Sequence, residues 1–320
     1  MAQPLWLFGL NTPYMIVKKD SQVARIAQVF KEFALLLRDT FMHWKERDPF
    51  NNSTIIAYYS IFSLPGLLII IINVAGYFFD RAEVTTRITS QIQAIVGGDT
   101  ARDIEAIIVK ASESKATLLS SILGIGTLLF GATGVFYELQ QMLNRIWEVK
   151  QKSQTRQKIW VLIRDRIFSF GLILVVGFLL LISLVLSAGL SAFSDWVVVH
   201  LSASLNAVFR LLDVVVSVGI ITILFAALFK FLPDVKLKWS DVWGGAFLTA
   251  FLFVVAKFAL GFYFGQSNFS STYGAAGSII LIMLWVSYTG LILLFGAEFT
   301  HAHIRKRRKR ILPTAVAVHI

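Results

Sequence analysis

Residues 277–300 read GSIILIMLWVSYTGLILLFGAEFT, an apolar run in which Glu298, near the end, is the one charged side chain. A helix of about 20 residues crosses the ~30 Å hydrocarbon core of a bilayer, so this run is long enough. Five further stretches have the same character: 54–79, 117–137, 168–190, 211–233 and 242–265. Backbone polar groups in hydrocarbon must be satisfied within the segment, which makes helices the expected structure. The sequence therefore predicts an all-α polytopic membrane protein with six transmembrane helices.

The composition agrees with this fold class. Hydrophobic residues make up 56% of the 320 residues and charged residues only 15%, which is more apolar and less charged than an ordinary soluble domain. There is no cysteine, so disulfides and thiol chemistry are excluded.

Lysine and arginine predict the orientation, because cytoplasmic loops are enriched in both. The termini and alternate loops on one side carry 23 of these residues, the loops on the other side carry six, and Lys257 lies inside a span. Both termini are therefore predicted to be cytoplasmic. The net charge of +11 is interpreted as attraction to anionic lipid head groups, at about 1 kcal/mol per basic residue. Anionic membrane lipids are thus the expected partners, and nucleic acid is not.

Three regions are expected along the chain. Residues 1–53 form a cytoplasmic and interfacial N-terminal region, in which 21–47 has the apolar spacing of an amphipathic helix. This helix either lies in the head-group plane or packs against the cytoplasmic ends of the spans. Residues 54–300 form the transmembrane domain, with an outer helical insertion at 80–116 that is expected to be a two-helix cap. Residues 301–320 form a basic cytoplasmic tail.

Polar groups at membrane depth are candidates for function because they are costly there. Lys257 lies slightly outward of the predicted midplane, with Asp213 as a candidate partner and Asn73 at a similar level. These three residues are the predicted substrate-binding or coupling site. The alternative is that Lys257 extends its ammonium to the outer interface and has no further role.

A second polar layer is predicted at the cytoplasmic ends of the spans. Its candidate members are Tyr58, Tyr59, Glu138, Arg145 and Glu298. The layer either lines an inward-facing cavity, gated by Glu298 with Arg145, or forms a structural lock.

The first span contains Pro65-Gly66 near its middle, and proline kinks or breaks a helix. This pair is the candidate hinge. Gly261 and Gly265 allow close helix packing, within one chain or between copies in a homo-oligomer.

The search for catalytic motifs is negative: no P-loop, no G-x-S-x-G, no H-E-x-x-H and no metal-ligand cluster is found. We expect no catalytic residues, no metal and no cofactor.

Six short motifs occur in order along the chain. They are Ala57-Tyr-Tyr-Ser-Ile-Phe-Ser-Leu-Pro65, Leu139-Gln-Gln-Met-Leu-Asn-Arg-Ile-Trp147, Leu232-Pro233-Asp-Val, Trp239-Ser-Asp-Val-Trp-Gly-Gly-Ala246, Tyr273-Gly-Ala-Ala-Gly-Ser278 and Gly296-Ala-Glu298. Together they resemble the YihY/BrkB family of bacterial inner-membrane proteins, once labelled ribonuclease BN, over about residues 20–305. The resemblance implies six spans, cytoplasmic termini, a bacterial inner-membrane location, and a link to envelope lipid export and serum resistance.

The leading hypothesis is an inner-membrane transporter or flippase-like protein for a lipidic or amphipathic envelope substrate. The first alternative is a non-transporting scaffold for envelope assembly, which would use the outer cap and the basic interfacial helix. The second alternative is a membrane-bound ribonuclease, against which the chain lacks the clustered ligands that metal-dependent hydrolysis needs.

Overall fold

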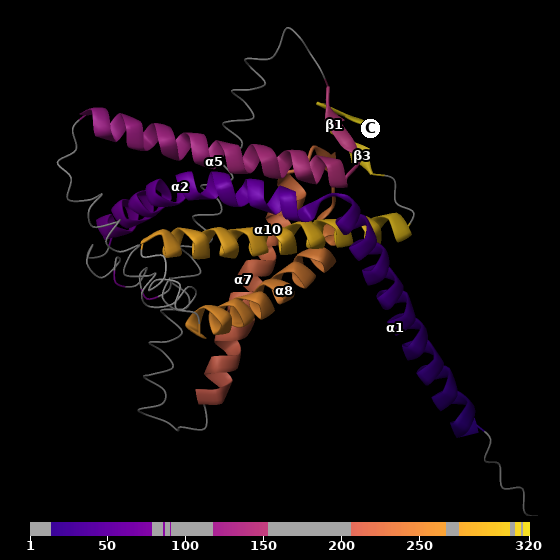
Figure 1. The fold of residues 1–320 in the computed structure, drawn as a ribbon. Coiled ribbons are helices and arrows are strands. Elements are labelled where there is room, and N and C mark those ends of the chain that lie inside the picture. Colours follow the sequence, from indigo (N-terminus) through magenta and orange to yellow (C-terminus); the bar gives the residue numbers. More distant parts are fainter. Residues whose placement is uncertain are drawn as a thin grey trace, which may run out of the picture.

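The computed structural model describes residues 14–78, 86, 90, 118–152, 206–266, 275–307, 311–314 and 316–320 (Figure 1). In chain order the elements are α1 (Tyr14–Glu46), α2 (Pro49–Phe78), α5 (Leu118–Ile146), β1 (Val149–Gln151), α7 (Asn206–Phe231), β2 (Val235–Lys236), α8 (Trp239–Gln266), α10 (Ala275–Lys306), β3 (Leu312–Pro313) and β4 (Ala317–His319). The predicted third span lies outside the described residues. So does the predicted outer cap, except for Thr86 and Ser90.

The helices confirm a helical membrane protein. Within the described part of the chain, three segments are long and apolar enough to cross a membrane: Val214–Phe231, Trp239–Leu260 and Ile279–Lys306. They lie in α7, α8 and α10 and match the predicted fourth, fifth and sixth spans. Helices α2 and α5, of 30 and 29 residues, cover the predicted first and second spans. Helix α2 is continuous through Pro65-Gly66, so this pair does not break the helix.

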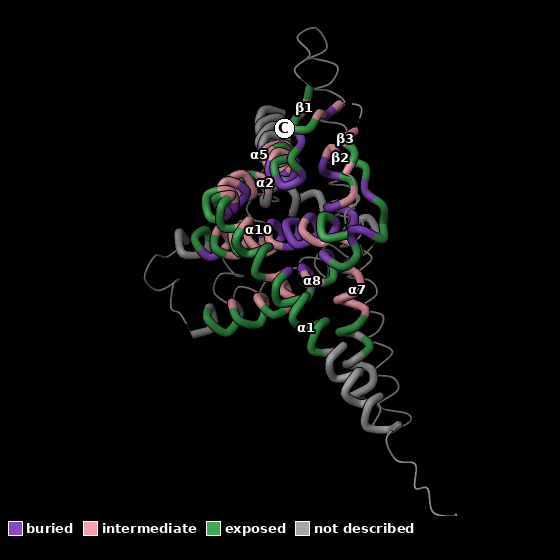
Figure 2. The backbone as a smooth tube through the Cα atoms, turned by 90° about the vertical axis from the view of Figure 1, so that its right-hand side faces the viewer, coloured by how far each residue is buried: buried purple, intermediate pink, exposed green. Residues whose placement is uncertain are grey.

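Helix α10 is the central element of the bundle. It packs against α2 and α5 on one side and α8 on the other, while α7 packs against α8. Figure 1 shows α2, α5 and α10 running side by side, with α7 crossing them steeply and α8 lying obliquely below α10. Figure 2, viewed from the side, shows buried residues along α10 and exposed ones along α1. The buried residues of α10 lie mainly in its second half, from Leu293 to Ile304, and this half is in the interior of the bundle.

The crossing of α8 and α10 depends on a reciprocal pair of glycines and threonines. A Cβ atom at Gly245 of α8 would overlap Thr300 of α10, and a Cβ atom at Gly296 of α10 would overlap Thr249 of α8. Each threonine is fully buried and donates its hydroxyl to its own helix, Thr249 to the Gly245 carbonyl at 2.7 Å and Thr300 to the Gly296 carbonyl at 2.8 Å. The hydroxyls are thus satisfied locally, and the glycines let the two backbones approach closely.

Four short strands depart from the all-α prediction. Strand β1 pairs antiparallel with β4, and β2 pairs antiparallel with β3. The predicted basic tail thus begins as the last turns of α10, which continues to Lys306, and its final residues return to the bundle as β3 and β4. Strands of two or three residues carry no readable alternation, and their partners are distant in sequence. We call the end of the bundle that carries these strands the strand end.

Helix α1 extends away from the rest of the molecule (Figure 1). It packs on α10 through its second half, where Trp44 Nε1 donates to the Leu291 carbonyl at 3.3 Å. Nearer the middle of α1, Lys306 Nζ of α10 donates a hydrogen bond to Glu32 Oε2 at 2.9 Å. This hydrogen bond and the positive charge of Lys306 lower the pKa of Glu32. Val29 and Phe30 are exposed beside basic residues. This surface agrees with the predicted amphipathic character, and its place in the head-group plane stays a prediction.

The glycine pair gives a matched test of helix packing. Gly245→Ala should destabilise the protein by about 1–3 kcal/mol, because the added methyl group enters a filled contact. Gly244→Ala is the control, since a Cβ atom there meets nothing within 4 Å. Thermal unfolding in detergent should therefore show a lower Tm for Gly245→Ala only. Equal Tm values for the two variants would contradict the close crossing.

Candidate functional site

The site is built around Glu298, a carboxylate on α10 whose side chain is 2% exposed. Its Oε2 atom lies 3.4 Å from Nε of Arg47. The contact is an ion pair without hydrogen-bond geometry, and Oε2 has no hydrogen-bond partner among the described residues. A buried carboxylate is costly unless it is paired and hydrogen-bonded. Glu298 is therefore paired with a guanidinium that is loosely aligned with it.

Arg47 is positioned by the short connection between α1 and α2. Asp48 adopts a left-handed conformation with φ of 50°, and Pro49 begins α2, where a proline fits the first helical turn. Asn52 Nδ2 donates to the Arg47 carbonyl at 2.7 Å, which fixes the connection to the first turn of α2. The chain direction at this point turns the Arg47 side chain toward α10.

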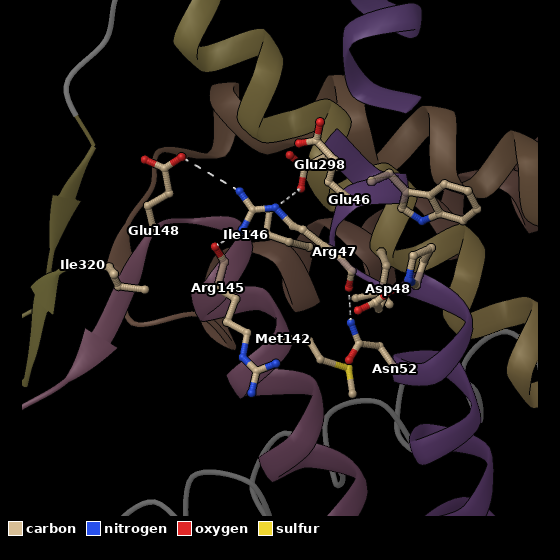
Figure 3. Close-up of a pocket in the computed structure, with 13 residues that line it drawn as sticks. Glu46, Arg47, Asp48, Asn52, Met142, Arg145, Ile146, Glu148, Glu298 and Ile320 are labelled. Carbon is tan, nitrogen blue, oxygen red and sulfur yellow. Dashed lines mark hydrogen bonds and ion pairs between the residues drawn. The ribbon is translucent and has the colours of Figure 1, made fainter. Parts of the chain in front are cut away.

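The guanidinium of Arg47 joins three elements (Figure 3). It donates through Nη1 to the backbone carbonyl of Arg145 at the end of α5. Its Nη2 lies 3.9 Å from Glu148 Oε1, in the turn after α5. Figure 3 shows Arg47 between the carboxylates of Glu148 and Glu298. The Arg47 guanidinium therefore forms ion pairs with two carboxylates, the half-exposed Glu148 and the buried Glu298.

The other oxygen of Glu298 faces a histidine. Nδ1 of His301, one turn further along α10, lies 3.9 Å from Glu298 Oε1, and His301 is also buried. The Trp147 ring packs edge-on against the imidazole, with centroids 5.3 Å apart. The side chains of Arg47, Glu298, His301 and Trp147 thus contact one another in that order.

Two cavities meet at Glu298. The larger, of about 530 Å³, is lined by Trp44, Glu46, Arg47, Asp48, Pro49, Asn52, Met142, Arg145, Ile146, Glu148, Leu294, Glu298 and Ile320. The smaller, of about 420 Å³, is lined by Leu35, Leu36, Asp39, His43, Glu298, His301, Ala302, Arg305 and Lys306. Glu298 lines both cavities, although its side chain is only 2% exposed.

A carboxylate at the turn after α7 holds the strand end together. Asp234 accepts hydrogen bonds from Nδ2 of Asn144 at 2.8 Å and Nε2 of Gln151 at 3.2 Å, and its own N–H donates to Asn144 Oδ1 at 2.8 Å. The Asp234 carbonyl accepts from the N–H of Thr314 at 2.9 Å. The end of α5, β1, the end of α7 and the C-terminal residues are therefore fixed to one another beside the larger cavity.

The predicted cytoplasmic polar layer is only partly assembled. Arg145 and Glu298 line the larger cavity together, but the guanidinium against Glu298 is that of Arg47. Tyr59 packs against Gly134 of α5, where a Cβ atom would overlap its ring, and Tyr58 is 53% exposed. Glu138 is half-buried on α5 and lines neither of these cavities. Tyr59 therefore belongs to the α2–α5 contact, and Tyr58 packs on Phe62 of its own helix.

The predicted outer site stays a prediction. Lys257 is half-buried on α8 and has no ion pair within the described part of the chain. Asp213 and Asn73 lie in α7 and α2, but their side chains are outside the described part, as is that of Pro65. The surroundings of the predicted packing pair, Gly261 and Gly265, are outside it too.

Two residues of the site were not predicted: Arg47 and Trp147. In the sequence, Arg47 contributes only to the N-terminal charges that predict the orientation. The available signal was its position directly before an Asp-Pro turn and a span. Ion pairing across 251 positions of sequence leaves no local pattern.

Comparisons with known proteins identify relatives. A family model described as "Virulence factor BrkB" matches residues 40–318. A "UPF0761 membrane protein" of Pseudoalteromonas atlantica is 26% identical over 254 residues, covering 77% of this chain and 78% of that protein. A protein of the same name from Tolumonas auensis is 29% identical over 180 residues, 56% of each chain. The "Putative ribonuclease-like protein YfkH" of Bacillus subtilis is 24% identical, covering 85% of this chain and 96% of that protein. No solved structure matches.

The ion pair can be tested by removing one partner at a time. Arg47→Met should destabilise the protein by about 3–5 kcal/mol, because it leaves a buried carboxylate without its cation. Arg145→Met is the matched control, since Figure 3 shows its guanidinium turned away from Glu298. Thermal unfolding in detergent is the measurement.

The double variant Arg47→Met with Glu298→Gln should recover most of the loss in Tm, because the carboxamide carries no charge. A Tm for Arg47→Met equal to that of Arg145→Met would show that the Arg47–Glu298 ion pair does not contribute to the stability of the protein.

Proposed function

The chain belongs to the virulence factor BrkB family, and from that membership we propose that it is an inner-membrane transporter or flippase-like protein for a lipidic or amphipathic envelope substrate. The observation that carries the proposal is the buried Glu298–Arg47 pair between two cavities. A stable bundle has no need of such a pair, because apolar residues of similar volume are often as stable or more so. Ionisable groups kept at this cost mark substrate or ion pathways in membrane proteins.

The larger cavity suits an amphipathic ligand. Its wall combines charged side chains with the apolar side chains of Trp44, Met142 and Leu294. The charged groups are the guanidiniums of Arg47 and Arg145 and the carboxylates of Glu46, Asp48, Glu148 and Glu298. A volume of about 530 Å³ is in the range of small-molecule sites, which bury apolar surface and orient a few polar groups. An anionic head group next to an acyl segment satisfies both kinds of wall. Anionic membrane lipids are accordingly the proposed partners.

The remaining parts of the proposal extend the predicted topology. Both termini lie in the cytoplasm of a bacterium, six helices span the inner membrane, and the strand end faces inward. Lys257, with Asp213 and Asn73, binds or couples the substrate nearer the outer face, and Pro65-Gly66 is the hinge in α2. No catalytic residue, cofactor or nucleic acid takes part in this scheme.

The alternative of a non-transporting scaffold has one observation in its favour. Helix α1 projects from the bundle with exposed apolar residues among basic ones, including Val29 and Phe30. Such a helix can dock on a lipid surface without any passage of substrate. The ribonuclease alternative rests on the name of one relative, the ribonuclease-like protein of Bacillus subtilis. Among the residues that the structure describes, no group of three or more His, Asp or Glu could hold a metal ion.

Purified protein in proteoliposomes tests the proposal. The probe is phosphatidylglycerol with a fluorescent NBD group on a short acyl chain, and the readout is the fraction that dithionite bleaches from outside. A transporter or flippase lets dithionite bleach the inner-leaflet probe as well, in proportion to the protein present. Bleaching that stops at the outer-leaflet fraction, as in protein-free vesicles, would overturn the proposed function.

Lys257→Met separates the transporter from the scaffold. The transporter predicts that this variant folds, elutes as the wild type does, and loses inner-leaflet bleaching. Lys236→Met, which removes an exposed lysine of β2, is the control and should bleach normally. Equal bleaching by both variants would remove Lys257 from the pathway.

A further inference from the structure

Arg47 and Arg145 are the cations that line the larger cavity, and the guanidinium of Arg47 is already occupied. Glu298 lies 3.4 Å from Nε and Glu148 lies 3.9 Å from Nη2. The side chain of Glu148 is 56% exposed, so water can solvate that carboxylate when Arg47 turns away. Glu298 has no such access to bulk solvent. Arg47 can therefore leave Glu298 only if the charge of this buried carboxylate is compensated in another way.

A carboxylate that is 2% exposed cannot lose its cation and stay charged without a penalty of several kcal/mol. One proton removes the penalty, because a neutral carboxyl needs only hydrogen-bond partners. The anion and the proton then replace the internal ion pair with two new contacts. The Arg47 guanidinium binds the anion and the Glu298 carboxyl keeps the proton, so the net charge of the site stays the same.

We propose that the Arg47–Glu298 pair is a joint site for one proton and one anionic head group, bound together. The proposal rests on the proposed function and deepens it, since it names a phosphodiester-type anion as the ligand and the proton as the coupled ion. The resting state is the ion pair that the structure shows. The loaded state has the anion on Arg47 in the larger cavity and the proton on Glu298.

His301 supplies the route for the proton. It lines the smaller cavity, and its Nδ1 lies 3.9 Å from the Glu298 oxygen that does not face Arg47. A proton passes from water in the smaller cavity to the imidazole and then to the carboxylate, either directly after a small rotation or through one water. The imidazole takes a proton from water on Nε2 and gives one to Glu298 from Nδ1, so its charge is restored and its tautomer is exchanged. Proton exchange with water in the smaller cavity then restores the first tautomer.

Other charged groups face the pair from the neighbouring elements. In the larger cavity they are Glu46, Asp48, Arg145 and Glu148, and in the smaller cavity Asp39, His43, Arg305 and Lys306. Each lies in a cavity open to solvent, and only Glu298 faces both cavities. Glu298 is thus the group at which proton binding and anion binding meet.

Binding measured against pH tests the proposal. The full chain is placed in phosphatidylcholine nanodiscs, and the probe is dihexanoyl phosphatidylglycerol, whose phosphodiester does not titrate in the range used. Calorimetry from roughly pH 5 to 8, repeated in buffers of different ionisation enthalpy, gives the Kd and the proton uptake. One linked proton predicts that Kd rises about tenfold per pH unit above the point where the free site loses its proton. Uptake of one proton per probe should accompany binding there.

Two carboxylate variants decide the assignment. Glu298→Gln mimics the protonated state and should bind the probe with a Kd that does not change with pH and without proton uptake. Glu138→Gln removes a carboxylate that lines neither cavity and should behave as the wild type does. Elution volume and Tm check that both variants fold.

The proposal is overturned if the wild type binds with a pH-independent Kd, if it does not bind the probe, or if Glu298→Gln keeps the proton uptake. Proton-linked binding without inner-leaflet bleaching in the vesicle assay would support this site and reject transport. Bleaching that is equal in the wild type and Glu298→Gln at every pH would support transport and reject this site.

Discussion

A single buried carboxylate constrains the strand end of the molecule. Glu298 lies on the central helix, where it is almost inaccessible to solvent, and the chain must bring a cation to it. Arg47 does so from the connection between α1 and α2, and the same guanidinium also contacts the end of α5 and the turn after it. The relative placement of α1, α2, α5 and α10 therefore converges on one ionic contact. Such a contact contributes little net stability but is costly to break on one side, so it specifies geometry more than it stabilises the fold.

Close helix packing makes this geometry rigid. Gly245 and Gly296 bring α8 and α10 together, and the buried hydroxyls of Thr249 and Thr300 are satisfied within their own helices. At the strand end the hydrogen bonds around Asp234 fix the ends of α5 and α7 and the returning C-terminal residues. The larger cavity is lined mostly by residues of α1, α2, α5 and α10 and of their connections, and charged contacts of Arg47 join several of them. A rigid frame with a loosely aligned ion pair can change its charge state without a change of fold.

The sequence predicts the parts that have a periodic or compositional signal. The apolar stretches locate α2, α5, α7, α8 and α10, and the rarity of charge in them singles out Glu298 and Lys257. The rest depends on contacts between distant positions. Arg47 and Glu298 are paired only because α1 and α2 turn at Asp48, and the four strands are too short to show an alternating pattern. Depth alone predicts that Tyr58 and Tyr59 belong to the cytoplasmic polar layer, whereas Tyr59 packs on Gly134, whose role no local pattern marks.

The measurement that tests this account most directly is a density map of the protein in nanodiscs that contain phosphatidylglycerol, recorded at acidic and at neutral pH. The account predicts head-group density in the larger cavity against Arg47 at acidic pH, with the guanidinium separated from Glu298. At neutral pH it predicts an empty site and the ion pair intact. A cavity without lipid at both pH values, with lipid only on the outer surface of the bundle and Arg47 always on Glu298, would contradict the account and favour a scaffold.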